Sequence, residues 1–356
     1  MSAEQKPVLM KGNEAAAEGA IAGGCRYFFG YPITPQNEIP HYMAEHMPEV
    51  GGVYLQAESE VAAINMVFGA ASTGARVMTS SSGPGIALMQ EALSYMIGAR
   101  VPCLVVNVCR GGPGLGNIGT SQSDYWMATR GAGHGDGRCI TFAPATVQEQ
   151  YDLCCESFDV AERYRHPVMV LSEAALGQMM EPVFVRERGE APPGDKPWAL
   201  GGRRAGRERR VINSLYAQPD DLARENRKLA ELYEQVKREQ VRWTEVGDDD
   251  PEVLIVAFGI PARCSETAME RAAASGIRTR LVRPISLFPF PHEPIRRWAQ
   301  AAPHTLVVEG SIGQMVDDVR MAVGDQSEVS LLTVLGGLIT TPEEIAQRIH
   351  AIARER

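Results

Sequence analysis

The sequence predicts an α/β protein with two parts: a layered domain around a mainly parallel sheet, then a second, smaller α/β unit. Over the first 189 residues, β-prone segments alternate with helical segments, a pattern typical of a parallel sheet with helices on its faces. Val101–Val108 is a nearly continuous apolar run, as expected of a strand buried on both faces. The alternation resumes at Pro251, and 356 residues suffice for two hydrophobic cores.

In the first unit, residues 1–189, each expected element has a local signal. β-Branched and aromatic runs predict strands, and apolar residues at helical spacing predict helices. Asn13 is expected to cap the first helix. Strands are expected at residues 27–29, 53–56, from 76, at 101–108, near 139 and at 167–171; helices are expected from 12, at 37–46, from 60, at 86–97 and from about 146.

Residues 190–250 are expected to connect the two units. Residues 190–210 are rich in Pro, Gly and Arg, and the arginines at 203, 204, 207, 209 and 210 indicate a solvated face more than a partner contact. A long polar helix is expected over residues 221–244. Its apolar residues recur every seven positions and predict a narrow seam against the same protein or a sister subunit: Leu222, Leu229, Val236 and Trp243.

The second unit is expected over residues 251–356. Its strands are expected at 253–258, 279–282, 305–308 and 330–334, and its helices begin near 261, 291, 313 and 342.

Composition excludes several classes of protein. A net charge of −9 is opposite to that of a nucleic-acid-binding protein. No apolar run approaches the length of a membrane span, and the first 13 residues lack the features of a signal peptide. We therefore expect a cytoplasmic protein that binds neither nucleic acid nor membrane.

The seven cysteines show no CxxC spacing and lie mostly in apolar surroundings. This pattern predicts reduced, mostly buried thiols and no iron–sulfur cluster on this chain. We expect no metal site either.

Glu60 begins a notably apolar helical segment. A short β-prone run, Val53–Gln56, is followed by a break and then by a helix with apolar residues on nearly every side, which predicts burial all round. A carboxylate at that position is either a surface cap or a buried acid with a partner. Ser59 and Glu58 are neighbouring candidates for the same role.

Three further motifs have weaker support. Gly114–Gly119 matches the dinucleotide pattern GxGxxG, but four residues separate it from the preceding strand. Gly135–Gly137 begins like the diphosphate-binding motif of thiamine enzymes, yet the paired asparagines that should follow are missing. Ser80–Gly83 could bind phosphate through backbone N–H groups but lacks the lysine of a P-loop.

Four motifs in order resemble the α subunit of 2-oxoacid:ferredoxin oxidoreductases: Gly30–Pro35 (GYPITP), Gln56–Asn65 (QAESEVAAIN), Thr79–Gly85 (TSSSGPG) and Arg110–Gly114 (RGGPG). The resemblance covers residues 12 to about 183 and continues in Arg283–Pro289 and Val308–Ser311. Within the family, RGGPGLGNI (110–118) and GQMMEP (177–182) are similar to the branched-chain, 2-oxoisovalerate type, and the 2-oxoglutarate type is second.

The resemblance implies a pyrimidine-side thiamine diphosphate domain followed by a transketolase C-terminal-like domain. It also implies thiamine diphosphate with Mg²⁺ shared with a β subunit, and coenzyme A as cosubstrate. The [4Fe-4S] clusters would lie on the β, γ and δ partners, the last two ferredoxin-like, and electrons would pass to ferredoxin. The missing diphosphate and cluster motifs are then expected on other chains.

By the same resemblance, Glu60 is the catalytic glutamate that hydrogen-bonds the cofactor's pyrimidine ring and favours the tautomer that removes the reactive proton. Ile33 and Arg110 fall at the cofactor, and Thr34 and Arg110 fall at the substrate carboxylate, which a guanidinium can bind through two hydrogen bonds. Leu115 and Ile118 are expected to make the distal pocket apolar.

Two alternatives remain open. One is half of another thiamine enzyme, of the transketolase or 2-oxoacid dehydrogenase β type, which needs no cluster-bearing partner. The other is a non-catalytic nucleotide-binding or scaffold protein built on the same sheet.

Overall fold

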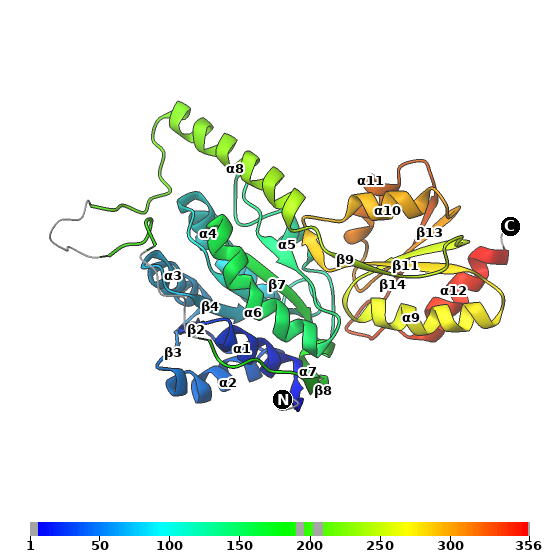
Figure 1. Ribbon diagram of the computed structural model, residues 1–356, viewed down its shortest axis with the longest axis horizontal. Coiled ribbons are helices and arrows are strands. Elements are labelled where there is room, and N and C mark those ends of the chain that lie inside the picture. The colour runs from blue at the N-terminus through cyan, green and yellow to red at the C-terminus, as the bar shows by residue number, and fades with distance from the viewer. Residues whose placement is uncertain (1–5, 190–195, 202–208, 355–356) are drawn as a thin grey trace, which may run out of the picture.

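The computed structural model describes residues 6–189, 196–201 and 209–354, which form two α/β units joined side by side (Figure 1). The first unit has a seven-stranded sheet in the order β12-β6-β7-β5-β4-β2-β3, parallel except for β12. Its strands are β2 (Tyr27–Gly30), β3 (Val53–Gln56), β4 (Val77–Ser81), β5 (Leu104–Cys109), β6 (Ile140–Phe142), β7 (Val168–Glu173) and β12 (Ser286–Phe288).

Helices cover both faces of this sheet, as the sequence predicts. Alternate side chains of β4 and β5 point into two separate cores. One core contains α1 (Gly12–Ala22), α2 (Glu38–His46) and α6 (Val147–Tyr164), and the other contains α3 (Glu60–Ser72) and α4 (Gly83–Ala99). The shorter elements are β1 (Val8–Lys11), paired with β8 (Met180–Val183), the 3-10 turn η1 (Pro48–Val50), α5 (Tyr125–Thr129) and α7 (Ala174–Gln178).

The expected cap of the first helix is wrong. Asn13 is fully buried inside α1, and the capping box is made by Lys11 and Glu14. The Asn13 amide instead donates to Pro35 O and Glu38 Oε2, each at 2.8 Å. Asn13 therefore anchors the loop that follows β2 rather than the start of its own helix.

The second unit has a five-stranded sheet in the order β14-β13-β10-β11-β9, with only β9 antiparallel. Its strands are β9 (Trp243–Gly247), β10 (Val253–Ala257), β11 (Thr279–Pro284), β13 (His304–Glu309) and β14 (Glu328–Thr333); its helices are α9 (Gly259–Ala274), α10 (His292–Ala299), α11 (Met315–Val323) and α12 (Pro342–Arg354). The four strands and four helices expected here are present, and β9 and β12 are the additions.

These two added strands link the units. β9, from the expected connecting region, lies at the edge of the second sheet, and β12, from the expected second unit, pairs with β6 of the first sheet. One hydrophobic core also runs through both units, since it contains Met89 of α4 together with Phe258 and Ile295. The chain thus crosses between the units several times.

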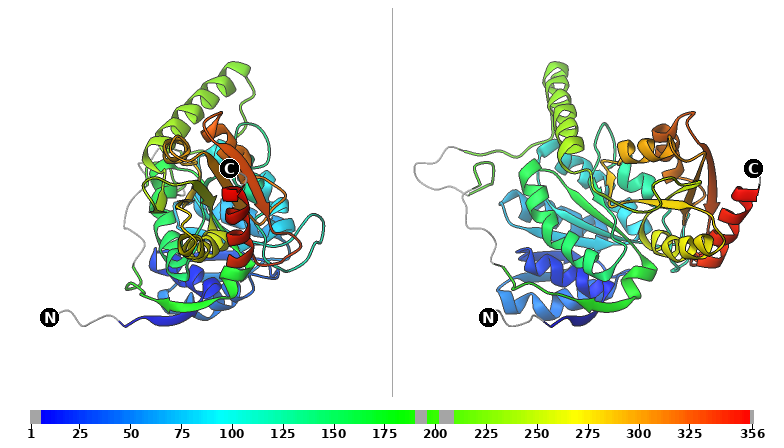
Figure 2. Two further views of the ribbon diagram at one scale, coloured as in Figure 1. Left: turned by 90° about the vertical axis from the view of Figure 1, so that its right-hand side faces the viewer. Right: turned by 45° about the vertical axis from the view of Figure 1, so that its right-hand side comes forward.

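The long connecting helix, α8 (Pro219–Glu239), projects from the body of the molecule (Figure 2). Its C-terminal half is anchored, because Leu232 and Val236 are buried, whereas Leu222 is 45% exposed. The expected end of the helix is wrong: α8 stops at Glu239, so Trp243 lies in β9 and not on the seam. Arg203, Arg204 and Arg207 lie outside the described residues, and Arg210 donates to Lys196 O and Ala199 O.

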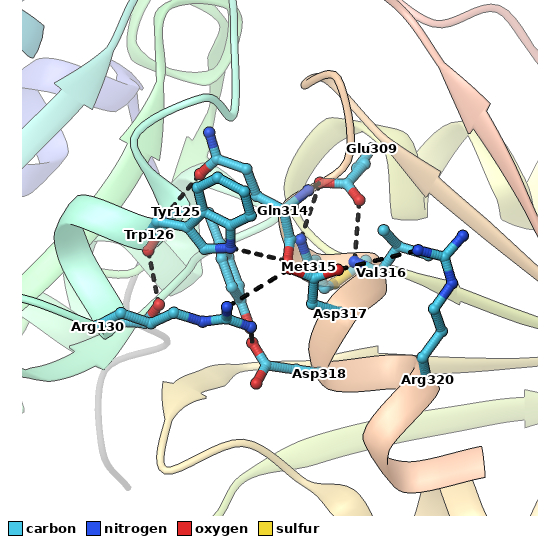
Figure 3. A network of polar contacts seen from close by, with 11 residues as sticks. Tyr125, Trp126, Arg130, Glu309, Gln314, Met315, Val316, Asp317, Asp318 and Arg320 are labelled. Atoms are coloured by element: carbon cyan, nitrogen blue, oxygen red, sulfur yellow. Dashed lines mark hydrogen bonds and ion pairs between the residues drawn. The ribbon is translucent and has the colours of Figure 1, made fainter. Parts of the chain in front are cut away.

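A polar network joins α5 of the first unit to α11 of the second (Figure 3). The Tyr125 hydroxyl donates to Asp318 at 2.7 Å, and the Trp126 indole N–H donates to Gln314 O at 3.2 Å. With the shared core, these bonds fix the relative placement of the two units.

The seven cysteines are free thiols, six of them buried and Cys264 partly buried, which confirms the expectation of unpaired, mostly buried residues. Within the described ranges, no helix is both long enough and apolar enough to cross a bilayer.

Candidate active site

The residues singled out from the sequence meet at one edge of the first sheet. β2, β4 and β5 are parallel neighbours, with β3 beside β2, so the loops that follow them emerge together. Those loops carry Thr34, Glu60, Ser81–Gly85 and Arg110. The carboxyl ends of parallel strands are where α/β sheets most often bind ligands.

Glu60 is the first residue of α3 and is only 7% exposed. Ser59 caps the helix, since its hydroxyl accepts a hydrogen bond from Ala62 N at 3.1 Å, and Glu58 is exposed. The structure therefore gives the three candidates different positions: Ser59 is the cap, Glu58 lies at the surface, and Glu60 is the buried acid. Within the described residues, the Glu60 carboxylate accepts no hydrogen bond, although it lies where the helix dipole favours an anion.

The prediction that α3 is buried all round is wrong. Val61, the residue after the glutamate, is 43% exposed, and the adjacent edge strand β3 exposes Val53 and Leu55 to 43% and 40%. The apolar pattern was read correctly, but one flank of the helix lies open beside the site. An apolar surface of this kind typically marks contact with another protein.

A glycine makes room for the Glu60 carboxylate. A Cβ atom on Gly85 would lie 2.1 Å from Ser81 Oγ and 2.6 Å from Glu60 Oε1, both well inside contact distance. The buried hydroxyls of Ser81 and Ser82 have no hydrogen-bond partner within the described residues. The turn from β4 into α4 thus holds a buried acid next to two hydroxyls able to bind a further group.

The loop after β2 is held by residues that sequence reasoning missed. Gln36 is fully buried and accepts a hydrogen bond from the Ser80 hydroxyl at 2.5 Å. Asn37 Nδ2 donates to the Thr34 hydroxyl at 3.3 Å, and Asn13 binds the next carbonyl, Pro35 O. Thr34 is exposed and Ile33 partly so. No local sequence signal separates these amides from ordinary polar residues, because their role depends on tertiary contacts.

Arg110 bridges this loop and its own. Its guanidinium donates to Thr34 O at 2.9 Å and to Leu115 O at 3.1 Å, while its buried Nε has no partner within the described residues. Thr34 and Arg110 are therefore neighbours. Leu115 and Ile118 are 85% and 62% exposed, so within this chain they do not close the pocket that the sequence predicts.

Two buried acids near the site were also missed. Asp124 accepts a hydrogen bond from Asn107 Nδ2 at 3.0 Å, and burial raises its pKa although Asn107, Cys109 and Arg110 oppose the shift. Burial raises the pKa of Glu173, at the end of β7, to about 7. The Glu173 carboxyl accepts hydrogen bonds from Gln122 Nε2 and Ile260 N, both at 2.9 Å, so this acid links the two units.

Metal-binding side chains are scarce. Across the described parts of the chain, no group of three or more His, Cys, Asp or Glu side chains is arranged to hold a metal ion.

Comparison with known proteins places this geometry in a class. A family model described as pyruvate flavodoxin/ferredoxin oxidoreductase, thiamine diphosphate-binding, matches residues 18–244, and a model of pyruvate:ferredoxin oxidoreductase core domain II matches residues 251–345. The fold and site are those of a thiamine diphosphate-binding α/β protein.

Two relatives match almost end to end. The ketoisovalerate oxidoreductase subunit VorB of Methanothermobacter thermautotrophicus is 45% identical, over 97% of each chain. The 2-oxoglutarate synthase subunit KorA of Archaeoglobus fulgidus is 38% identical, over 96% of this chain and 98% of that one. The chain belongs to the 2-oxoacid:ferredoxin oxidoreductase family, whose members are oxidoreductase subunits of multi-subunit complexes.

Solved structures agree. The 2-oxoglutarate:ferredoxin oxidoreductase from Magnetococcus marinus, solved with 2-oxoglutarate, coenzyme A and succinyl-CoA, superposes with a TM-score of 0.89 at 28% identity. The match covers 98% of this chain but 65% of that one, so the chain spans about two thirds of the length of that structure. A split-gene transketolase matches with a TM-score of 0.61 at 14% identity, a likeness of fold alone.

Proposed function

We propose that this chain is the α-type subunit of an enzyme that converts 2-oxoisovalerate and related branched-chain 2-oxoacids to acyl-CoA and carbon dioxide, with reduction of ferredoxin. The observation that carries the proposal is the buried Glu60 at the carboxyl end of the first sheet, beside Thr34 and Arg110. The 45% identity to a ketoisovalerate oxidoreductase subunit, against 38% to a 2-oxoglutarate synthase subunit, favours the branched-chain substrate.

The site fits the pyrimidine end of thiamine diphosphate. Glu60 offers a carboxylate without a hydrogen-bond donor of its own, Ser81 and Ser82 offer unpaired hydroxyls, and Gly85 leaves the approach open. Glu60, Ile33 and Arg110 would hold the cofactor, which supplies the nucleophilic carbon and electron sink for decarboxylation when bound. Glu60 would exchange a hydrogen bond, and in part a proton, with the pyrimidine ring nitrogen. A flexible, water-exposed acid could not do this as precisely.

The rest of the cofactor site would come from another chain. The described residues offer no metal-binding cluster, so the Mg²⁺ and diphosphate ligands would lie on a β subunit, which would also carry a [4Fe-4S] cluster. The open apolar flank formed by Val53, Leu55 and Val61 lies beside Glu60, where such a subunit would cover it. Ferredoxin-like γ and δ subunits would complete the complex and pass electrons to ferredoxin.

Substrate binding would use the two neighbours across the loop. Arg110 has a buried Nε without a partner, and a guanidinium suits a carboxylate. Thr34 lies exposed beside it and offers a hydroxyl. Leu115 and Ile118, exposed in this chain, would form one wall of an apolar pocket that the partner completes. Without a second cation, such a pocket would leave the distal carboxylate of 2-oxoglutarate unpaired, at a cost of several kcal/mol.

The test is kcat/KM for both acids with the complete complex. We expect a clear preference for 2-oxoisovalerate. A clear preference for 2-oxoglutarate would overturn the branched-chain assignment but leave the family assignment intact, and it would indicate a cation supplied by the partner.

A second experiment tests the need for a partner. Calorimetric titration of the isolated chain with thiamine diphosphate and Mg²⁺ should show weak binding, and the complex should bind tightly. Tight binding by the isolated chain would contradict the shared site and favour a self-sufficient thiamine enzyme of the transketolase type.

A further inference from the structure

A pocket of about 760 Å³ lies away from Glu60, in the angle between the first unit, the end of α8 and the second unit. β12 and the segment after it form its floor, α10 and α11 of the second unit form one wall, and Lys237 of α8 stands opposite. Its volume is in the range of pockets that enclose a small organic ligand. Thr34, Glu60 and Arg110 do not line it, so it is separate from the proposed active site.

The floor is apolar and aromatic. Leu287, Phe288 and Phe290 are at most 7% exposed and present their side chains to the pocket, and Trp243 stands at its rim, 39% exposed. The His292 ring lies against Phe290, with 5.2 Å between ring centroids. Burial lowers the pKa of His292, so its ring is neutral near pH 7 and adds an aromatic surface rather than a charge. Such a floor suits a flat ring system.

Most charged groups around the pocket neutralise one another. Arg130 pairs with Asp318 at 3.2 Å, a contact visible in Figure 3, and Arg297 pairs with Glu245 at 2.8 Å. Glu293 pairs with Arg296, a matched pair on α10. These pairs leave little net charge on the wall formed by the second unit.

Two cations remain on the opposite side. The Arg138 guanidinium lies over the Phe288 ring, 5.1 Å from its centroid, and has no carboxylate partner within the described residues. Lys237 is 50% exposed and pairs only with Glu234, one turn away on the same helix surface, a contact of small energetic value. In a protein with a net charge of −9, a pocket with two cations available and an aromatic floor is distinctive.

We propose that this pocket binds a small aromatic anion of the nucleoside phosphate class. The base would lie on the floor formed by Phe288, Phe290 and His292. The phosphates would lie between Arg138 and Lys237, which a charged acceptor can bind more strongly than the surface carboxylate does. Because both units and α8 line the pocket, its ligand would contact all three and couple their relative positions.

The experiment is calorimetric titration of the enzyme, purified with its native partner subunits, with ADP, adenosine and pyrophosphate. We expect saturable ADP binding and binding at least tenfold weaker for adenosine and for pyrophosphate, since each lacks half of the ligand. Arg138→Gln and Lys237→Gln should each weaken ADP binding about tenfold, the loss of one charged contact.

Lys228→Gln is the matched control. Lys228 also lies on α8, is 55% exposed and pairs with Glu225 three residues away, as Lys237 pairs with Glu234, but it does not line the pocket. Its substitution should leave ADP binding unchanged. The proposal fails if ADP does not bind, if pyrophosphate binds as tightly as ADP, or if Lys228→Gln weakens binding as much as Lys237→Gln does.

Discussion

The two units place a buried glutamate at similar positions and use it differently. In both, the acid lies beyond a parallel strand and at the start of a helix, Glu60 at α3 and Glu309 before α11. Glu309 is fully buried and accepts hydrogen bonds from the backbone N–H groups of Gln314, Met315 and Val316, each at 3.0 Å. Glu60 accepts none within the described residues and lies beside unpaired hydroxyls.

The difference separates structural from functional acids. The second unit fills the anion-favouring end of its helix with its own carboxylate, so no binding capacity remains there. The first unit leaves that capacity available, as a binding or catalytic site requires. Burial of a glutamate alone did not distinguish the two; the hydrogen-bond partners did.

The largest expected effect is on catalysis at Glu60. Glu60→Gln should lower kcat of the complex by about 10²–10⁴-fold, because an amide cannot exchange the proton that a carboxylate can. The side chain is nearly the same size, so circular dichroism and complex assembly should be unchanged. The control is the exposed Glu58→Gln, which should retain nearly full activity; equal losses in both variants would contradict the assignment.

Next is the stability of the second unit. Glu309→Gln should lower the free energy of unfolding by about 3 kcal/mol, since a charged acceptor of several backbone N–H groups becomes a weaker, partly mismatched one. Urea denaturation measures this. Glu60→Gln, which breaks no hydrogen bond in this chain, should change stability by less than about 1 kcal/mol. If the two variants lost the same stability, the proposed distinction would not hold.

Glu173 should give the interface between the units a pH dependence. Its folded pKa, about 7, lies above the ordinary value of 4.5, so the unfolded chain ionises first as pH rises. Stability relative to Glu173→Gln should therefore be greatest below pH 4.5 and fall by about 2–3 kcal/mol as pH rises to 7.

Denaturation of both proteins at several pH values between 4.5 and 8 measures this difference. The exposed Glu270→Gln, on α9, controls for loss of a carboxylate. A difference that stays constant or grows with pH would contradict the raised pKa.

The smallest expected effect is on substrate affinity. Arg110→Lys should raise KM for 2-oxoisovalerate and 2-oxoglutarate alike, by roughly 2 kcal/mol, since lysine cannot make two parallel hydrogen bonds to the shared carboxylate. Steady-state kinetics with both acids measures it. A loss confined to one acid would place Arg110 at the distal pocket instead.

Sequence carried the argument where function requires particular residues in contiguous motifs. The order of strands and helices was readable from apolar periodicity, and Glu60, Thr34 and Arg110 could be named because short motifs surround them. Gln36, Asn13 and Asp124 could not be named, since their roles come from contacts between distant segments. Likewise, β12 is too short to announce that it joins the other sheet, and apolar residues in α3 do not reveal which flank a partner covers.

The central claim, that Glu60 controls proton transfer at the cofactor, is tested most directly by deuterium exchange at the reactive ring carbon of thiamine diphosphate bound to the complex. This readout precedes decarboxylation and does not depend on electron transfer. We expect exchange in the Glu60→Gln complex to be slower by orders of magnitude than in wild type, with cofactor affinity largely retained. Exchange at the wild-type rate in that variant would contradict the role assigned to Glu60.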